Sequence, residues 1–190
     1  MGSILNPNRD NSFTSLAHRK DKYLFVDKTD FIYETNKRLN EDNRFMAVTR
    51  PRRFGKTVTA HMLSTYYSKS YEGQNIFDGL KITGQVKDQE YTSEKDKEKA
   101  EERATELRAS YEKHLNKYDV IYIDMNSIRS LYIGYLNKTE KIQNVNDIVD
   151  YLEYSVIKEL KEEERFSECL KKKKIENTGL LRLYQHYNII

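Results

Sequence analysis

The sequence has little cysteine, few histidines and no signature of a nucleophilic hydrolase. The single cysteine, Cys169, excludes a framework of internal disulfides, and a reducing cytoplasmic setting is the simpler expectation. The four histidines lie far apart and accompany no C-x-x-C or H-E-x-x-H pattern, so no zinc site is predicted. A G-x-S-x-G nucleophile elbow is also lacking.

Long apolar runs are lacking too. None approaches the roughly 20 residues that a membrane-spanning helix needs, and residues 1–21 have no apolar stretch typical of a signal peptide. The 33 basic and 30 acidic residues nearly balance, so the net charge of +3 does not by itself demand a nucleic-acid partner. We expect a soluble chain with no membrane partner, and 190 residues are enough for one domain or part of one.

The most informative stretch is the octapeptide Arg50, Pro51, Arg52, Arg53, Phe54, Gly55, Lys56, Thr57. It follows an apolar run at 45–48 and opens a helical pattern. A strand that leads through a turn into a helix directs free backbone N–H groups and the positive end of the helix dipole at one anion. We expect the N–H groups of Arg53 to Thr57 to hold phosphates, Lys56 to neutralise them and the Thr57 hydroxyl to bind Mg²⁺.

The full pattern G-x-x-x-x-G-K-[ST] has glycine where this chain has Arg50, so only its second half is present. The competing interpretation is a solvated basic surface turn. The octapeptide nevertheless resembles the variant Walker A of the AAA-ATPase-like family, in which arginine or lysine replaces the first glycine. Residues 23–32 resemble the Tyr-x-Val-Asp-Lys-Thr segment that precedes this loop, and residues 75–82 are similar to a segment that follows the first helix.

The resemblance covers residues 12–82 well and residues 118–124 more loosely. It implies that the chain is the N-terminal part of an ATPase with ATP and Mg²⁺ as cofactors, and that longer relatives carry a C-terminal nuclease-like domain. The octapeptide from Arg50 to Thr57 would be the nucleotide-binding site, with Lys56 as its catalytic residue. ATP hydrolysis would then require the complete protein.

The predicted fold is an α/β domain of P-loop type, whose parallel sheet includes strands at 45–49 and 120–124 with helices on its faces. One helix is expected over 27–39, with Asp27 or Thr29 as N-cap. The Asp27-Lys28-Thr29 segment either starts this helix or also stands beside the nucleotide. A second helix is expected from Thr57 to about residue 72. Its tyrosines are assigned to packing rather than to base stacking.

Residues 87–117 are highly charged, yet Ala100, Ala104, Leu107, Tyr111 and Leu115 recur at helical spacing. We interpret this segment as an inserted, largely solvated helix. A partner-binding arm is the alternative. A further amphipathic helix is expected around 146–160, and Lys171 to Lys174 form either a solvated helix end or a phosphate contact. The apolar ending after residue 180 resembles a truncation.

Asp124 ends an apolar stretch in which it would be presented as a Walker B aspartate to magnesium, next to Thr57. The resemblance favours another interpretation, in which a later strand supplies that acid and Asp124 is a sheet-edge residue. The predicted function is ATP binding. The alternative is a non-enzymatic module that binds nucleic acid or protein through Arg50 to Lys56. Arg50, Arg52 and Arg53 add phosphate contacts or face a neighbouring subunit, which would make the chain a homo-oligomer.

Overall fold

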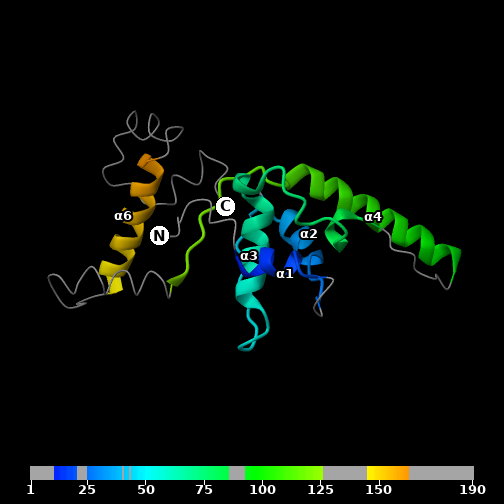
Figure 1. The fold of residues 1–190 in the computed structure, drawn as a ribbon, viewed down its shortest axis with the longest axis horizontal. Coiled ribbons are helices and arrows are strands. Elements are labelled where there is room, and N and C mark those ends of the chain that lie inside the picture. The colour runs from blue at the N-terminus through cyan, green and yellow to red at the C-terminus, as the bar shows by residue number, and fades with distance from the viewer. Residues whose placement is uncertain are drawn as a thin grey trace. The chain divides into compact units, whose positions relative to one another are not determined.

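The computed structural model describes residues 11–20, 25–39, 41–42, 44–85, 93–125 and 145–162. Within them the chain forms helices α1 (Ser12–Ala17), α2 (Asp30–Asn36), α3 (Lys56–Tyr67), η1 (Lys69–Tyr71), η2 (Lys81–Thr83), α4 (Glu94–His114) and α6 (Val145–Glu162) (Figure 1). The chain divides into two compact units. One, Arg9–Lys117, holds α1 to α4, and the other holds α6.

The predicted parallel sheet is wrong for the part of the chain that the structure describes, which contains helices and no strand. Residues 45–50 are exposed, with Phe45 77% and Val48 46% accessible. An apolar run becomes a strand only when a neighbouring strand satisfies its backbone N–H and C=O groups. Residues 118–124 likewise show isolated bridge positions rather than a continuous ladder.

The core of the Arg9–Lys117 unit is aromatic. Phe13 of α1 stacks on Phe77 at a centroid distance of 5.3 Å, and Tyr66 of α3 meets Phe77 edge to face at 5.6 Å. Tyr66, Tyr67 and Tyr71 are at most 3% exposed, so their predicted role in packing is confirmed. The phenol oxygens are also satisfied, since Tyr67 donates to Asn36 Oδ1 at 2.7 Å.

Helix α1 is held against α3 by its own cap. The Asn11 carboxamide oxygen accepts from the backbone N–H groups of Phe13 and Thr14, which satisfies two donors that a helix start leaves open. The Asn11 amide nitrogen then donates to Thr65 Oγ1 of α3 and to the Tyr71 hydroxyl, both at 2.9 Å. One side chain therefore both starts α1 and fixes its position.

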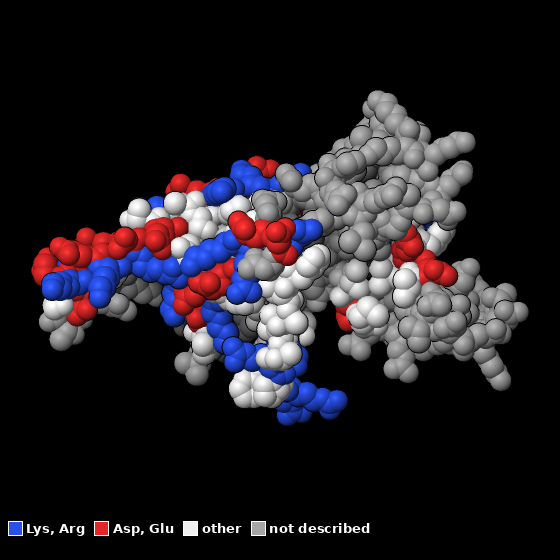
Figure 2. Space-filling model, turned by 180° about the vertical axis from the view of Figure 1, so that it is seen from behind, with Lys and Arg blue, Asp and Glu red and all other residues white. Residues whose placement is uncertain are grey.

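The charged helix predicted over 87–117 appears as α4, and its predicted apolar stripe is the side that packs. Leu107 is buried, whereas residues 93–99 are exposed at every position. Figure 1 shows this end of α4 extending beyond α1 to α3, and Figure 2 shows bands of basic and acidic side chains along it. The N-terminal half of α4 is thus a solvated projection, and its C-terminal half belongs to the core.

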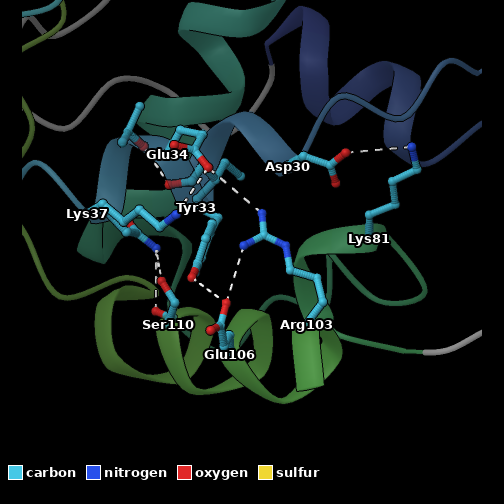
Figure 3. Close-up of polar contacts among 11 residues, drawn as sticks. Asp30, Tyr33, Glu34, Lys37, Lys81, Arg103, Glu106 and Ser110 are labelled. Carbon is cyan, nitrogen blue, oxygen red and sulfur yellow. Dashed lines mark hydrogen bonds and ion pairs between the residues drawn. The ribbon is translucent and has the colours of Figure 1, made fainter. Parts of the chain in front are cut away.

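A polar cluster joins α4 to α2 (Figure 3). The Tyr33 hydroxyl donates to Glu106 Oε2 at 2.7 Å, and the Arg103 guanidinium lies over the Tyr33 ring at 4.0 Å. Arg103 also pairs with Glu34 at 3.8 Å and with Glu106 at 3.4 Å. The hydrogen bond from Tyr33, followed by that from Arg103, lowers the pKa of Glu106 below its ordinary 4.5. These contacts fix α4 across α2.

In the second unit, the amphipathic pattern predicted around 146–160 forms α6. Val156 and Leu160 are each 1% exposed, whereas Val149 of the same pattern is 56% exposed, so the predicted apolar face is buried only toward the C-terminal end of α6. The segment Lys171 to Lys174 and the apolar ending lie outside the described residues.

Candidate phosphate-binding site

The loop from Arg50 to Gly55 reverses direction immediately before α3. Two of its residues have left-handed backbone, Arg53 at φ 67° and Gly55 at φ 78°. Glycine adopts this conformation without a Cβ clash, which explains why Gly55 stands directly before the helix. For Arg53 the conformation is uncommon and marks a tightly constrained turn.

The N-terminal end of α3 has no side-chain cap. Gly55 is its N-cap residue, and no acidic residue occupies the first turn. The first N–H groups of a helix have no intrahelical acceptor, and they lie at the positive end of the helix dipole. Because neither a cap nor a carboxylate meets them here, this end of α3 is suited to receive an anion.

Lys56, the first residue of α3, turns back over the loop. Its ammonium group donates to the backbone carbonyl oxygen of Arg50. This contact joins the first and seventh positions of the octapeptide, so the loop is curled around the Lys56 side chain. In Figure 2 basic side chains gather at the lower projection of the molecule, which in Figure 1 is the segment leading into α3.

A pocket of about 390 Å³ lies between this loop and the start of α2. Its lining combines three cations, two acids, three apolar side chains and a threonine. These are Lys28, Arg50 and Lys56, then Asp27 and Asp30, then Phe31, Val48 and Phe54, and finally Thr59. Two of the three sequence segments that carry the family resemblance, 23–32 and 50–57, thus meet at one cavity, although they are separated along the chain.

Asp27 shapes the second wall of this pocket. Its Oδ1 accepts from the backbone N–H of Thr29 at 2.9 Å and from Thr29 Oγ1 at 2.7 Å, and its Oδ2 accepts from the N–H of Lys81 at 2.8 Å. Thr29 is the N-cap residue of α2, as one of the two predictions had it, but its side chain makes no capping bond. Its hydroxyl instead accepts from the N–H of Ile82 at 3.1 Å.

The structure brings some of the predicted site residues together and leaves others outside. Arg50, Phe54 and Lys56 line the pocket, and Gly55 supports the turn. Pro51, Arg52, Arg53 and Thr57 are exposed and do not line it. Asp124 belongs to the other compact unit. The proposed magnesium ligands Thr57 and Asp124 therefore remain predictions.

Four lining residues were not predicted from the sequence, namely Asp30, Phe31, Val48 and Thr59. Val48 and Phe31 were assigned to a strand and to a helix face, where apolar side chains need no ligand to explain them. Only the approach of two separate segments shows that they share a cavity. Thr59 was not detectable either, because residues two apart on a helix point to nearly opposite sides, so the prediction for Thr57 does not extend to it.

Among the described residues, no three His, Cys, Asp or Glu side chains are grouped as a metal site. None of the described helices has the length and apolarity to cross a membrane.

Comparison with known proteins gives one match. A family model of the AAA-ATPase-like family, described as a predicted AAA-ATPase, matches residues 11–181. This range includes the loop, the Asp27 turn and all the described helices, and it confirms the predicted resemblance. The chain matches no curated protein and no solved structure.

Proposed function

We infer the function from the family, because the chain belongs to the AAA-ATPase-like family. We propose that the pocket before α3 binds the phosphates of ATP. Lys56 would leave the Arg50 carbonyl oxygen and contact the phosphates, while the free N–H groups of the first turn of α3 would donate to the same anion. When bound, Mg²⁺ would offset phosphate charge, with the Thr57 hydroxyl as its protein ligand.

The observation that carries this proposal is the pocket itself. Lys56, Arg50 and Lys28 converge on one cavity at the uncapped end of a helix. A solvated basic turn, the competing interpretation, gives no reason for the loop to curl around Lys56 and form a cavity with α2. We also propose that the complete protein hydrolyses ATP. The lone Cys169 leads us to propose a cytoplasmic setting for it.

Calorimetric titration of Mg-ATP into the wild-type chain and into Lys56→Ala tests the proposal. Loss of a charge-assisted hydrogen bond costs about 1.5–3 kcal/mol, so we expect the mutation to weaken binding by at least about tenfold. Lys99→Ala is the matched control, because Lys99 is an exposed lysine on the projecting half of α4. It should bind ATP as the wild type does.

A nucleic-acid module would give a different result. Neutralised phosphates release counterions, so DNA or RNA binding would weaken steeply with salt and show no preference for nucleoside triphosphates. Failure of folded wild-type chain to bind ATP, with salt-sensitive binding of an oligonucleotide, would replace the nucleotide site by this alternative.

A further inference from the structure

The turn at residues 27–29, which precedes α2, places its middle residue, Lys28, next to the loop of residues 50–55. Asp27 and Thr29 are both engaged in hydrogen bonds to the η2 segment, and Thr29 is fully buried. Lys28 lies between these two anchors and is itself exposed. The segment Asp27-Lys28-Thr29 therefore serves two purposes, because its outer residues fix the backbone and its middle residue projects its side chain.

The Lys28 ammonium group lies close to the turn before α3. A Cβ built on Gly55 would stand 3.9 Å from Lys28 Nζ, and Lys28 lines the pocket together with Arg50 and Lys56. Gly55 is the N-cap residue of α3, so this cation faces the same helix end as the loop.

The acids of the pocket are occupied by other groups. The two carboxylate oxygens of Asp27 accept the three hydrogen bonds that shape the turn. Asp30 pairs with Lys81 at 3.7 Å (Figure 3). Among the described residues, no hydrogen bond or ion pair engages the Lys28 ammonium group, whereas that of Lys56 donates to the Arg50 carbonyl. Three cations that converge without an acid partner repel one another, and a polyanion among them removes that repulsion.

We propose that Lys28 is a second phosphate-binding lysine, which clamps the triphosphate of ATP from the α2 side while Lys56 contacts it from the loop. This inference rests on the proposed function of the pocket. It assigns the Asp-Lys-Thr segment a direct part in ligand binding through its lysine, with Asp27 and Thr29 as positioning residues.

The test compares four proteins, the wild type, Lys28→Ala, Lys28→Arg and Lys37→Ala, by calorimetric titration of Mg-ATP and of inorganic tripolyphosphate. Lys37 is the control for a lost charge, because it lies on the same segment of chain but pairs with Glu34 and does not line the pocket. We expect Lys28→Ala to weaken binding of both probes by about tenfold or more. Lys28→Arg should retain most of the affinity, and Lys37→Ala should match the wild type.

The outcomes separate this inference from the proposal on which it rests. If Lys56→Ala abolishes ATP binding while Lys28→Ala binds normally, the second lysine is excluded and the nucleotide site stands. Equal weakening by Lys28→Ala and Lys37→Ala would reduce the effect to net charge and would also exclude it. Weakening of ATP binding without weakening of tripolyphosphate binding would assign Lys28 to the nucleoside. If the wild type binds neither probe, both proposals fail together.

Lys28 is exposed, so neither substitution is expected to unfold the chain, and equal thermal midpoints for Lys28→Ala and the wild type will verify this. Should Lys28→Ala nevertheless unfold, Lys28→Gln, which keeps the length of the stem but removes the charge, decides by the same criteria.

Discussion

Asn116 closes the C-terminal end of α3 from the turn that follows α4. Its N–H donates to the Tyr66 carbonyl oxygen at 2.8 Å, and its amide nitrogen donates to the carbonyl oxygens of Thr65 at 3.1 Å and Ser68 at 2.8 Å. The last carbonyl groups of a helix have no intrahelical donor, and this side chain supplies one. Its backbone is left-handed at φ 53°, a conformation that asparagine tolerates better than most residues.

We therefore expect Asn116→Ala to lower the free energy of unfolding by about 2 kcal/mol, because buried carbonyl groups lose their donor and alanine is strained at positive φ. Urea denaturation followed by circular dichroism measures the change. Asn116→Gly is the control that relieves the strain without restoring the donor, so it should lie between alanine and the wild type. Equal stability of all three proteins would show that the cap contributes nothing.

Gly84 is the point of closest approach between the η2 turn and α4. A Cβ at this position would lie 2.1 Å from the Ala104 carbonyl oxygen, and the backbone has φ +64°. Gly84→Ala should cost about 2 kcal/mol or more, since the helix backbone must move away. Gly73→Ala meets the same backbone restriction at φ +79° but no atom within 4 Å, so it should cost about 1 kcal/mol. Thermal unfolding of the two variants compares them, and a larger loss for Gly73→Ala would contradict the packing argument.

Sequence reasoning at the residue scale succeeded where one short motif supplies the chemistry. Lys56 and Arg50 were predicted from the octapeptide, and both line the pocket. The role of Lys28 was left undecided between a helix start and a position at the nucleotide. Its role depends on its closeness to Gly55 in the fold, which no local sequence pattern encodes. Residues that act through distant parts of the chain are only visible once those parts are placed.

At the scale of elements, helices with a clear apolar period were predicted correctly, whereas the predicted strands were wrong. Helix α3 was expected from Thr57 to about residue 72 but spans Lys56–Tyr67. It ends early because Ser68 is extended and its hydroxyl accepts from the Ser70 N–H, which starts η1 instead. The expected helix over 27–39 is also shorter than predicted. The Asp27 carboxylate accepts from the Thr29 N–H and holds residues 27–29 in a turn, so α2 begins only at Asp30.

The strand predictions failed for a different reason. A helix satisfies its backbone internally, so its pattern is sufficient, whereas a strand depends on a partner that its own residues do not specify. Residues 45–50 have the apolar run but no ladder among the described residues. Helix α4 was predicted correctly for the opposite reason. The helical spacing of Leu107 and the other apolar residues identified the side that packs, without any knowledge that α2 lies against this helix.

The stability of the whole molecule should decrease in acid, beginning with His114. This side chain is 6% exposed at the end of α4, and burial, with a smaller contribution from Lys113, lowers its pKa below the ordinary 6.5. When the folded pKa is lower than the unfolded one, the unfolded chain takes up the proton first. The stability that the neutral imidazole confers is therefore complete above pH 6.5 and is lost as the pH falls through the folded value.

Glu106 adds a second loss at lower pH. Its folded pKa is below 4.5, so its contribution to stability is present above that value and disappears on further acidification. Because Glu106 is exposed at the surface, this second decrease should be the smaller one. The loss from His114 begins below pH 6.5 and the loss from Glu106 only below pH 4.5, so the two can be probed from different starting points.

Unfolding free energies of the wild type and of His114→Gln between pH 7.5 and 5 test this order. In the wild type the free energy should decline by at most about 1.4 kcal/mol per pH unit below pH 6.5, the limit for one proton. The glutamine variant cannot take up that proton, so its profile should be flatter over the same range, even if it is less stable throughout. Tyr33→Phe removes the hydrogen bond to Glu106 and should leave this range unchanged while reducing the decline below pH 4.5. Parallel profiles of wild type and His114→Gln would place the acid sensitivity elsewhere in the chain.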